Sequence, residues 1–240
     1  MKPEDLESCS RKSLRRLFQA ERVAENSSSQ AVAIRHKLIV GLVTQFGKDF
    51  RRAFISFALE DMRARSEIII AWLYREYVLE QGYVWRGLTP DSYGYEQCLQ
   101  YILHGLYRKL EPGDRLFTRI LLDCPEITEG AINMIKSFCE NTEWQEVGIS
   151  TLYELLLRRS NLRTQMLDVL MGLTMNTNER VRDLAIDKCK DLFMIPGLAM
   201  QIEDFATTIL TRLIAENPVH ACSAEVCMHV IMFCLYSPNV

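Results

Sequence analysis

Hydrophobic residues recur at helical spacing along the second half of the chain. In "IEDFATTILTRLI", residues 202–214, the apolar positions follow the order i, i+3, i+4, i+7, i+8 and i+11. This order places them on one face of an α-helix, and no β-strand pattern competes with it. Stripes of the same kind occupy 161–175 and 178–194, and Asn178 is a suitable N-cap for the second of these helices. The pattern predicts an all-α chain.

The predicted helices form pairs. The pairs begin near residues 128, 161 and 198, which is the spacing of helical-hairpin repeats, where each unit buries its apolar face by stacking on the next. Thr142 and Gln145 fit a capping box at the start of one helix. A helix at about 222–236 is expected to complete the last pair. We therefore predict an alpha-solenoid of stacked antiparallel helix pairs.

The first half is less regular but is also predicted to be helical. Its expected helices are 10–25, 29–46, 48–59, 62–81, 94–110 and 114–123. No Gly or Pro enforces the break near residue 60, so a single helix over 48–80 fits the pattern almost as well. The whole chain, 1–240, is interpreted as one elongated helical-repeat domain, less regular over 1–125 and with repeat pairs over 126–240.

One segment resembles a HEAT repeat. It is "LDVLMGLTMNTNERVRDLAIDKC", residues 167–189, in which a leucine-rich helix and a short turn precede Val181, Arg182 and Ala185. Val181 begins a buried stripe, and the small Ala185 allows close approach of a neighbouring helix. Arg182 can reach back toward acceptors in the turn. The resemblance implies a HEAT-like alpha-solenoid.

The segment "LEDMRARSEIIIAWLYREY", residues 59–77, mixes charged and aromatic side chains. Trp72, Leu73 and Tyr77 share one helical face, which indicates core anchors rather than platforms for stacking bases. Arg63 and Glu67 are four residues apart and can pair on the surface of a helix. Two roles stay open for Arg63 and Arg65: they solvate a repeat boundary, or they bind a protein partner.

Composition argues against a dedicated nucleic-acid binder. The chain has 28 Lys and Arg against 31 Asp and Glu, a formal net charge of -3, so the overall positive charge of a phosphate-binding protein is missing. Basic runs at 11–16, 48–52 and 157–163 leave direct RNA binding by an alpha-solenoid as the alternative function.

Residues typical of catalysis and metal binding are poorly placed. No P-loop, GxSxG or GxGxxG motif occurs, and the adjacent Glu60 and Asp61 diverge by about 100° on a helix. On a single helix, His220 and Cys227 face away from Cys222 and His229, so the four cannot converge on zinc. We expect no enzyme activity, no cofactor, no metal and no small-molecule substrate.

Cysteine usage and hydropathy bear on location. The eight cysteines contain no CxxC pair and the chain is too long to need disulfides. No apolar run approaches the roughly 18 residues of a membrane span. We expect a soluble protein with reduced, mostly buried thiols in a reducing compartment, and no membrane partner.

Four blocks of sequence resemble the middle region of the symplekin family. They are "LIVGLVTQF" (38–46), "SFALEDMRARSEIIIAWLYREY" (56–77), "PEITEGAINMIKSFCEN" (125–141) and "ISTLYELLLRR" (149–159). The resemblance covers about residues 10–236, in the family's order. It implies a non-catalytic nuclear scaffold that supports the machinery for cleavage and polyadenylation of pre-mRNA and for histone pre-mRNA processing.

The expected partners are therefore protein subunits of the cleavage and polyadenylation complex, with RNA contact more indirect than direct. Members of this family are several times longer than 240 residues. The resemblance therefore implies nothing about the contacts that their other regions make.

Overall fold

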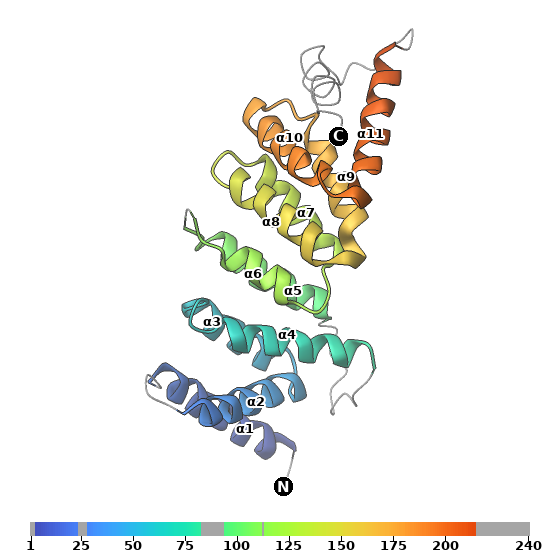
Figure 1. Cartoon of the computed structure of the whole chain (residues 1–240). Helices are drawn as coiled ribbons and strands as arrows, with labels where there is room; N and C mark the ends of the chain where they lie inside the picture. The colour runs from blue at the N-terminus through green and yellow to red at the C-terminus, as the bar shows by residue number, and fades with distance from the viewer. Residues whose placement is uncertain (1–2, 24–27, 83–93, 112, 215–240) are drawn as a thin grey trace. The chain divides into compact units, whose positions relative to one another are not determined.

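The computed structural model describes residues 3–23, 28–82, 94–111 and 113–214 (Figure 1). Over these residues the chain forms eleven α-helices, one short 3₁₀ helix and no strand. The prediction of an all-α chain is confirmed. The predicted helix at 222–236, with the turn-rich residues 83–93, lies outside the described part.

The chain divides into two compact units, 1–132 and 133–240. Each has its own buried apolar residues, and each is described by itself below. The interpretation of the chain as a single repeat domain stays a prediction.

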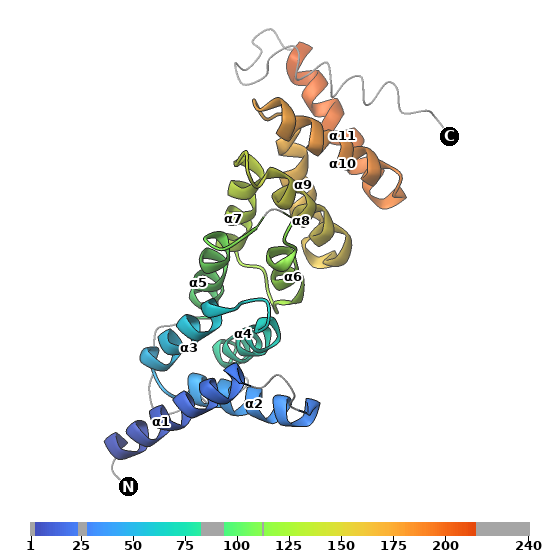
Figure 2. The same cartoon turned by 90° about the vertical axis from the view of Figure 1, so that its left-hand side faces the viewer.

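Unit 1 is built from six helices and the start of a seventh. They are α1 (Pro3–Arg22), α2 (Ser29–Gln45), α3 (Lys48–Glu60), α4 (Ser66–Glu80), α5 (Tyr95–Tyr107), α6 (Leu116–Asp123) and the first turn of α7 (Glu129–Glu140). Helix α2 packs against α1, α3 and α4, and α4 also contacts α5 and α6 (Figures 1 and 2). Helix α4 is therefore covered on several sides, which explains why so much of its circumference is apolar.

Two helices replace the single helix that 48–80 allowed. Residues 61–65 form a turn between α3 and α4, so α4 begins at Ser66, four residues later than expected. The turn needs no Gly or Pro because Asp61 leaves the helical region, with φ -146° and ψ 89°. Its carboxylate accepts a hydrogen bond from the Ala64 backbone N–H at 3.0 Å, which satisfies a donor that the broken helix leaves open.

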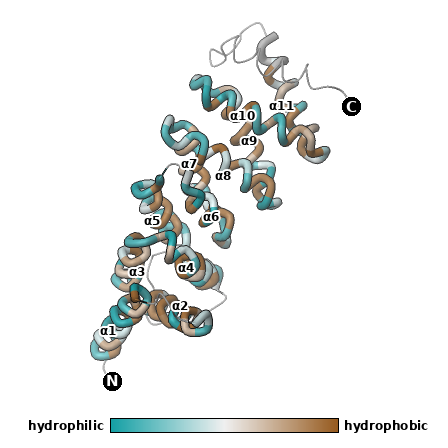
Figure 3. The backbone as a smooth tube through the Cα atoms, turned by 60° about the vertical axis from the view of Figure 1, so that its left-hand side comes forward, coloured by the Kyte–Doolittle hydropathy of each residue, from teal (hydrophilic) through white to brown (hydrophobic). Residues whose placement is uncertain are grey.

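Unit 2 contains the rest of α7, then α8 (Gln145–Arg158), a 3₁₀ helix (Ser160–Leu162), α9 (Arg163–Leu173), α10 (Glu179–Phe193) and α11 (Pro196–Ile214). Helix α8 packs on α9, and α10 packs on α8, α9 and α11. Figure 3 shows hydrophobic and hydrophilic residues alternating along these helices, as expected when one face of each is buried.

Two helix starts in unit 2 test the expected caps. Asn178 caps α10 through its side chain, which accepts from the Arg180 N–H at 3.1 Å, so that prediction is confirmed. The capping box at Thr142 is wrong: α8 starts at Gln145 behind Trp144, which makes no side-chain cap. Asn141 instead accepts from the Glu143 N–H at 2.9 Å, so this short turn is organised one residue earlier.

Candidate functional site

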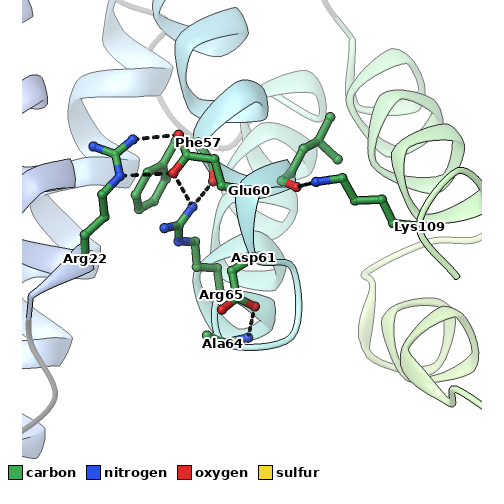
Figure 4. Close-up of polar contacts among 8 residues, drawn as sticks. Arg22, Phe57, Glu60, Asp61, Ala64, Arg65 and Lys109 are labelled. Atoms are coloured by element: carbon green, nitrogen blue, oxygen red, sulfur yellow. Dashed lines mark hydrogen bonds and ion pairs between the residues drawn. The ribbon is translucent and has the colours of Figure 1, made fainter. Parts of the chain in front are cut away.

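The α3–α4 turn, residues 61–65, holds the two arginines predicted to bind a partner. Arg65 is buried, and its guanidinium carbon lies 3.8 Å from the centroid of the Phe57 ring. It donates to the Phe57 carbonyl and, at 3.1 Å, to Glu60 Oε2 (Figure 4). Arg65 thus holds the turn against the end of α3, where it combines a cation–π contact with charge-assisted hydrogen bonds.

Glu60 joins this turn to α1. The Arg22 guanidinium donates two hydrogen bonds to the Glu60 carboxylate, from Nε to Oε2 at 3.0 Å and from Nη2 to Oε1 at 2.6 Å (Figure 4). The Arg22 hydrogen bonds are the main cause that lowers the pKa of the Glu60 carboxyl; burial opposes the lowering, and Arg65 adds to it. Glu60 is therefore an ionised acceptor shared by two arginines at neutral pH.

Arg63 is the accessible arginine of the turn, with 61% of its side chain exposed. It does not pair with Glu67, as the spacing had suggested, because α4 starts only at Ser66 and Arg63 is not on that helix. Its Nη2 lies 2.9 Å from Asp114 Oδ2 and 3.1 Å from Glu111 Oε2, both in the α5–α6 connection. Lys109 adds a hydrogen bond to the Leu59 carbonyl. Partner binding by Arg63 and Arg65 stays a prediction.

The three predicted core anchors lie on α4. Trp72 and Leu73 are completely buried, whereas Tyr77 is partly buried and packs edge-on against Tyr95, with ring centroids 5.4 Å apart. The indole of Trp72 tilts against Phe54 at 4.8 Å. Its faces are used inside the protein, so it offers no surface on which a base could stack.

A buried ion pair was missed by sequence analysis. Arg51 of α3 donates to both oxygens of Glu76 on α4, Nε to Oε1 at 2.7 Å and Nη2 to Oε2 at 3.0 Å. Trp72 Nε1 adds a third hydrogen bond to Oε1 at 2.9 Å. The position of Glu76 in the sequence could have indicated this ion pair. Glu76 follows Trp72 by four residues on the apolar face of the helix, where a buried carboxylate requires a partner.

Three of the buried cysteines, Cys98, Cys139 and Cys189, have thiols of low reactivity. Burial is the main cause that raises the pKa of Cys98, and the charge of Glu76 adds to it. Burial likewise raises the pKa of Cys139 and of Cys189 to about 12. These three residues are protonated thiols near neutral pH, and thiols rather than thiolates are poor nucleophiles.

The HEAT-like residues lie together at the start of α10. Val181 and Ala185 are completely buried, and Arg182 is 8% exposed. Arg182 Nη1 donates to the Asn176 carbonyl at 3.3 Å, so the side chain does reach back to the α9–α10 turn. Its Nε is buried and has no hydrogen-bond partner among the described residues.

The basic runs differ in how many cations they leave accessible. In 48–52, Arg51 is buried in its ion pair, and Asp49 lies 3.7 Å from Arg11 of α1. In 157–163, Arg158 lies 3.9 Å from Glu154, and Arg163 donates to the Leu156 carbonyl. The run at 11–16 keeps three exposed cations, Lys12, Arg15 and Arg16.

Two further predictions concern metals and membranes. Among the described residues, no group of three His, Cys, Asp or Glu side chains is arranged to hold a metal ion. His220, Cys222, Cys227 and His229 lie outside the described part. No helix within the described ranges combines the length and hydropathy needed to cross a membrane.

No family model matches the chain, and no solved structure matches its fold at a significant level.

Proposed function

We propose that this chain is a non-catalytic scaffold module, similar to the middle region of symplekin, that supports assembly of the nuclear machinery for pre-mRNA 3'-end cleavage, polyadenylation and histone pre-mRNA processing. The observation that carries the proposal is the set of four sequence blocks in the family's order. The most specific of them, residues 56–77, forms the end of α3, the α3–α4 turn and most of α4.

The use of charge in that block supports a scaffold. Glu60 is occupied by Arg22 and Arg65, and Glu76 by Arg51. These carboxylates brace one helix against another, whereas a general acid or base needs a carboxyl group that can exchange its proton with a substrate. The block therefore builds a rigid support, and its accessible side chains are available for a protein partner.

We further propose that the helices form a HEAT-like alpha-solenoid. Helices α9 and α10 support this, because a short turn joins them, Ala185 is buried between neighbours and Arg182 bonds to the turn. In repeat proteins of this class, each helix pair buries its apolar face on the next, and the remaining surface is extended and suited to binding other proteins.

Affinity purification from nuclear extract, with the full chain as bait, tests the scaffold proposal. We expect cleavage and polyadenylation subunits to be recovered equally well with and without nuclease treatment. Recovery that depends on intact RNA would favour the alternative, a direct RNA-binding alpha-solenoid, to which the exposed cations of α1 would contribute. Failure to recover any subunit of this machinery would reject the scaffold proposal.

The same purification assigns a role to Arg63. Arg63→Glu reverses an exposed charge, and Arg180→Glu is its matched control, because Arg180 is also exposed and is paired with Glu146. We expect Arg63→Glu to reduce subunit recovery without lowering the melting temperature by more than a few degrees, and Arg180→Glu to change neither. Unchanged recovery with Arg63→Glu would leave this arginine with a purely structural role.

A further inference from the structure

A groove between α1 and α3 of unit 1 ends at the Arg22–Glu60 pair described above, but its central residues have no part in the α3–α4 turn. Its volume is about 260 Å³, many times the roughly 10–15 Å³ that a cavity needs to hold one water molecule. Its charged lining residues are Arg11, Arg15 and Arg22 on α1 and Asp49 and Glu60 on α3. From Arg11 to Arg22 the helix rises about 16 Å, which is enough for a few residues of an extended peptide.

Ion pairs close the two ends of this α1–α3 groove. At one end Arg11 lies between Glu7, at 2.9 Å, and Asp49, at 3.7 Å. At the other end Arg22 holds Glu60, as Figure 4 shows. Two arginines, Arg22 and Arg65, offset the charge of Glu60. Arg11 is shared between Glu7 and Asp49, so one net negative charge remains at that end, and the positive charge at the centre of the groove comes from Arg15.

The centre of the groove is open and positively charged. Arg15 lines the centre and has no hydrogen-bond or ion-pair partner among the described residues, and the α3 residues that line the centre are the small, exposed Ala53 and Ser56. The exposed Lys12 and Arg16 flank it on α1 and add to the positive potential. Below them, the floor is apolar, formed by buried residues such as Leu14 and Phe50.

The aromatic residues of the floor argue against a nucleic acid. Phe18 stacks on Phe57 with centroids 4.1 Å apart and planes at 4°, and Arg65 lies 3.8 Å from the same ring. Two groups so close to one centroid must cover opposite faces, so Phe57 has no face free for a base. Base stacking on aromatic rings is a main part of single-stranded nucleic-acid binding. An acidic peptide needs only a cation for its carboxylate and an apolar surface for a neighbouring side chain.

We propose that the α1–α3 groove binds a short acidic segment of a partner protein. A carboxylate of the segment pairs with Arg15, and a neighbouring apolar side chain rests over Ala53 and Ser56 on the apolar floor. This inference rests on the proposed scaffold function, because it names the surface and the chemical class of partner that the scaffold uses.

A labelled synthetic peptide provides the probe. It has twelve residues in which Asp alternates with Leu and Phe, and its control replaces every Asp with Asn. We expect the full chain to bind the acidic peptide saturably at 150 mM salt, at least tenfold more tightly than the neutral peptide. Equal binding of the two peptides, or none, would overturn the proposal.

Variants separate the groove from general electrostatic attraction. Arg15→Glu should weaken peptide binding at least tenfold. Arg16→Glu makes the same charge change at an exposed position of the same helix, about 100° further round and outside the groove, and should weaken binding less than threefold. Ala53→Trp, which fills the centre of the groove, should match the loss seen with Arg15→Glu. Equal effects of Arg15→Glu and Arg16→Glu would reduce the binding to unspecific attraction and reject the site.

The Ala53→Trp variant is informative only if it folds. Arg15→Glu changes an exposed side chain, so it provides the test even if Ala53→Trp is unfolded. A single-stranded RNA that binds in an Arg15-dependent manner, when the peptide does not, would also reject the proposal.

The peptide assay and the nuclear purification distinguish failure of the groove from failure of the scaffold. If nuclear purification recovers no processing subunits while the peptide binds the groove, the scaffold assignment fails and the groove stands. If subunits are recovered equally by wild type and Arg15→Glu, the groove fails and the scaffold stands.

Discussion

Glu76 brings a carboxylate into the core of unit 1, where it is 3% exposed and accepts hydrogen bonds from Arg51 and Trp72. Removing a carboxylate from water costs several kcal/mol, which the bidentate geometry and the indole N–H offset. The attraction between Arg51 and Glu76 therefore stabilises the fold only while both partners are charged. A single neutralising change leaves the other charge buried and unpaired.

We expect Glu76→Gln to destabilise the protein by about 3 to 5 kcal/mol, because Arg51 then stays charged inside the core without its carboxylate. Urea unfolding followed by circular dichroism measures this loss. The control is Glu146→Gln, which removes a carboxylate from the exposed pair with Arg180 and should cost less than about 1 kcal/mol. Similar losses for the two variants would contradict the view that burial decides the value of the pair.

The contrast between the two arginines of the α3–α4 turn shows where residue-level prediction ended. Sequence placed Arg63 and Arg65 together beside two acids, yet one is exposed and the other is buried over Phe57. What separates them is the turn conformation and the position of α1, which brings Arg22 to Glu60. Partners 38 or more residues away cannot be read from local spacing.

At the level of helices, apolar spacing predicted the elements well because burial of one face determines most of α8 to α11. The boundaries were less certain. The start of α4 depends on the hydrogen bond from Ala64 to Asp61, and the start of α8 on the turn at Asn141. Each of these helix starts is fixed by a short hydrogen-bonded turn, and several neighbouring residues could have formed such a turn. The apolar periodicity alone therefore did not identify the first residue of the helix.

Helix α8 approaches α7 closely at Gly148. A Cβ atom added there would lie 2.5 Å from the Cys139 backbone nitrogen and 2.8 Å from the Phe138 carbonyl carbon. Backbone atoms cannot move aside as side chains do, so the two helices would have to separate. We expect Gly148→Ala to destabilise the protein by about 1 to 3 kcal/mol, measured as a lower urea midpoint.

Gly172 of α9 is the matched control for that variant. Nothing lies within 4 Å of a Cβ added at this position. Gly172→Ala should therefore leave stability unchanged or raise it by up to about 1 kcal/mol, since alanine favours the helix over glycine. A loss of stability with Gly172→Ala as large as that with Gly148→Ala would show that close helix packing is not what Gly148 provides.

For the whole molecule, the all-α class followed from the sequence because a helical period recurs throughout the chain. The division near residue 132 did not follow from it. Helix α7, Glu129–Glu140, contains that division, and nothing in its apolar stripe marks one. Contacts between segments distant in sequence define a compact unit, and a pattern read along one helix carries no information about them.

The balance of charge over the whole molecule bears on the RNA alternative. The formal net charge is -3, and Arg51 of the 48–52 run is buried. The largest group of exposed cations in the basic runs that have no ion-pair partner among the described residues is Lys12, Arg15 and Arg16. For single strands, each phosphate contact contributes about -0.7 to the slope of log affinity against log salt. Three cations therefore support a slope of about -2 at most.

We expect a labelled single-stranded RNA of about 20 nucleotides to bind no more tightly than roughly 10 μM at 150 mM salt, within the range of non-specific association. Fluorescence anisotropy across a salt series measures both affinity and slope. Arg16→Glu should make the slope shallower, since it removes one of three phosphate contacts. Submicromolar affinity, together with a slope steeper than about -4 that Arg16→Glu does not change, would require a phosphate-binding surface elsewhere on the chain. Direct RNA binding would then explain the function of the protein better than a scaffold role.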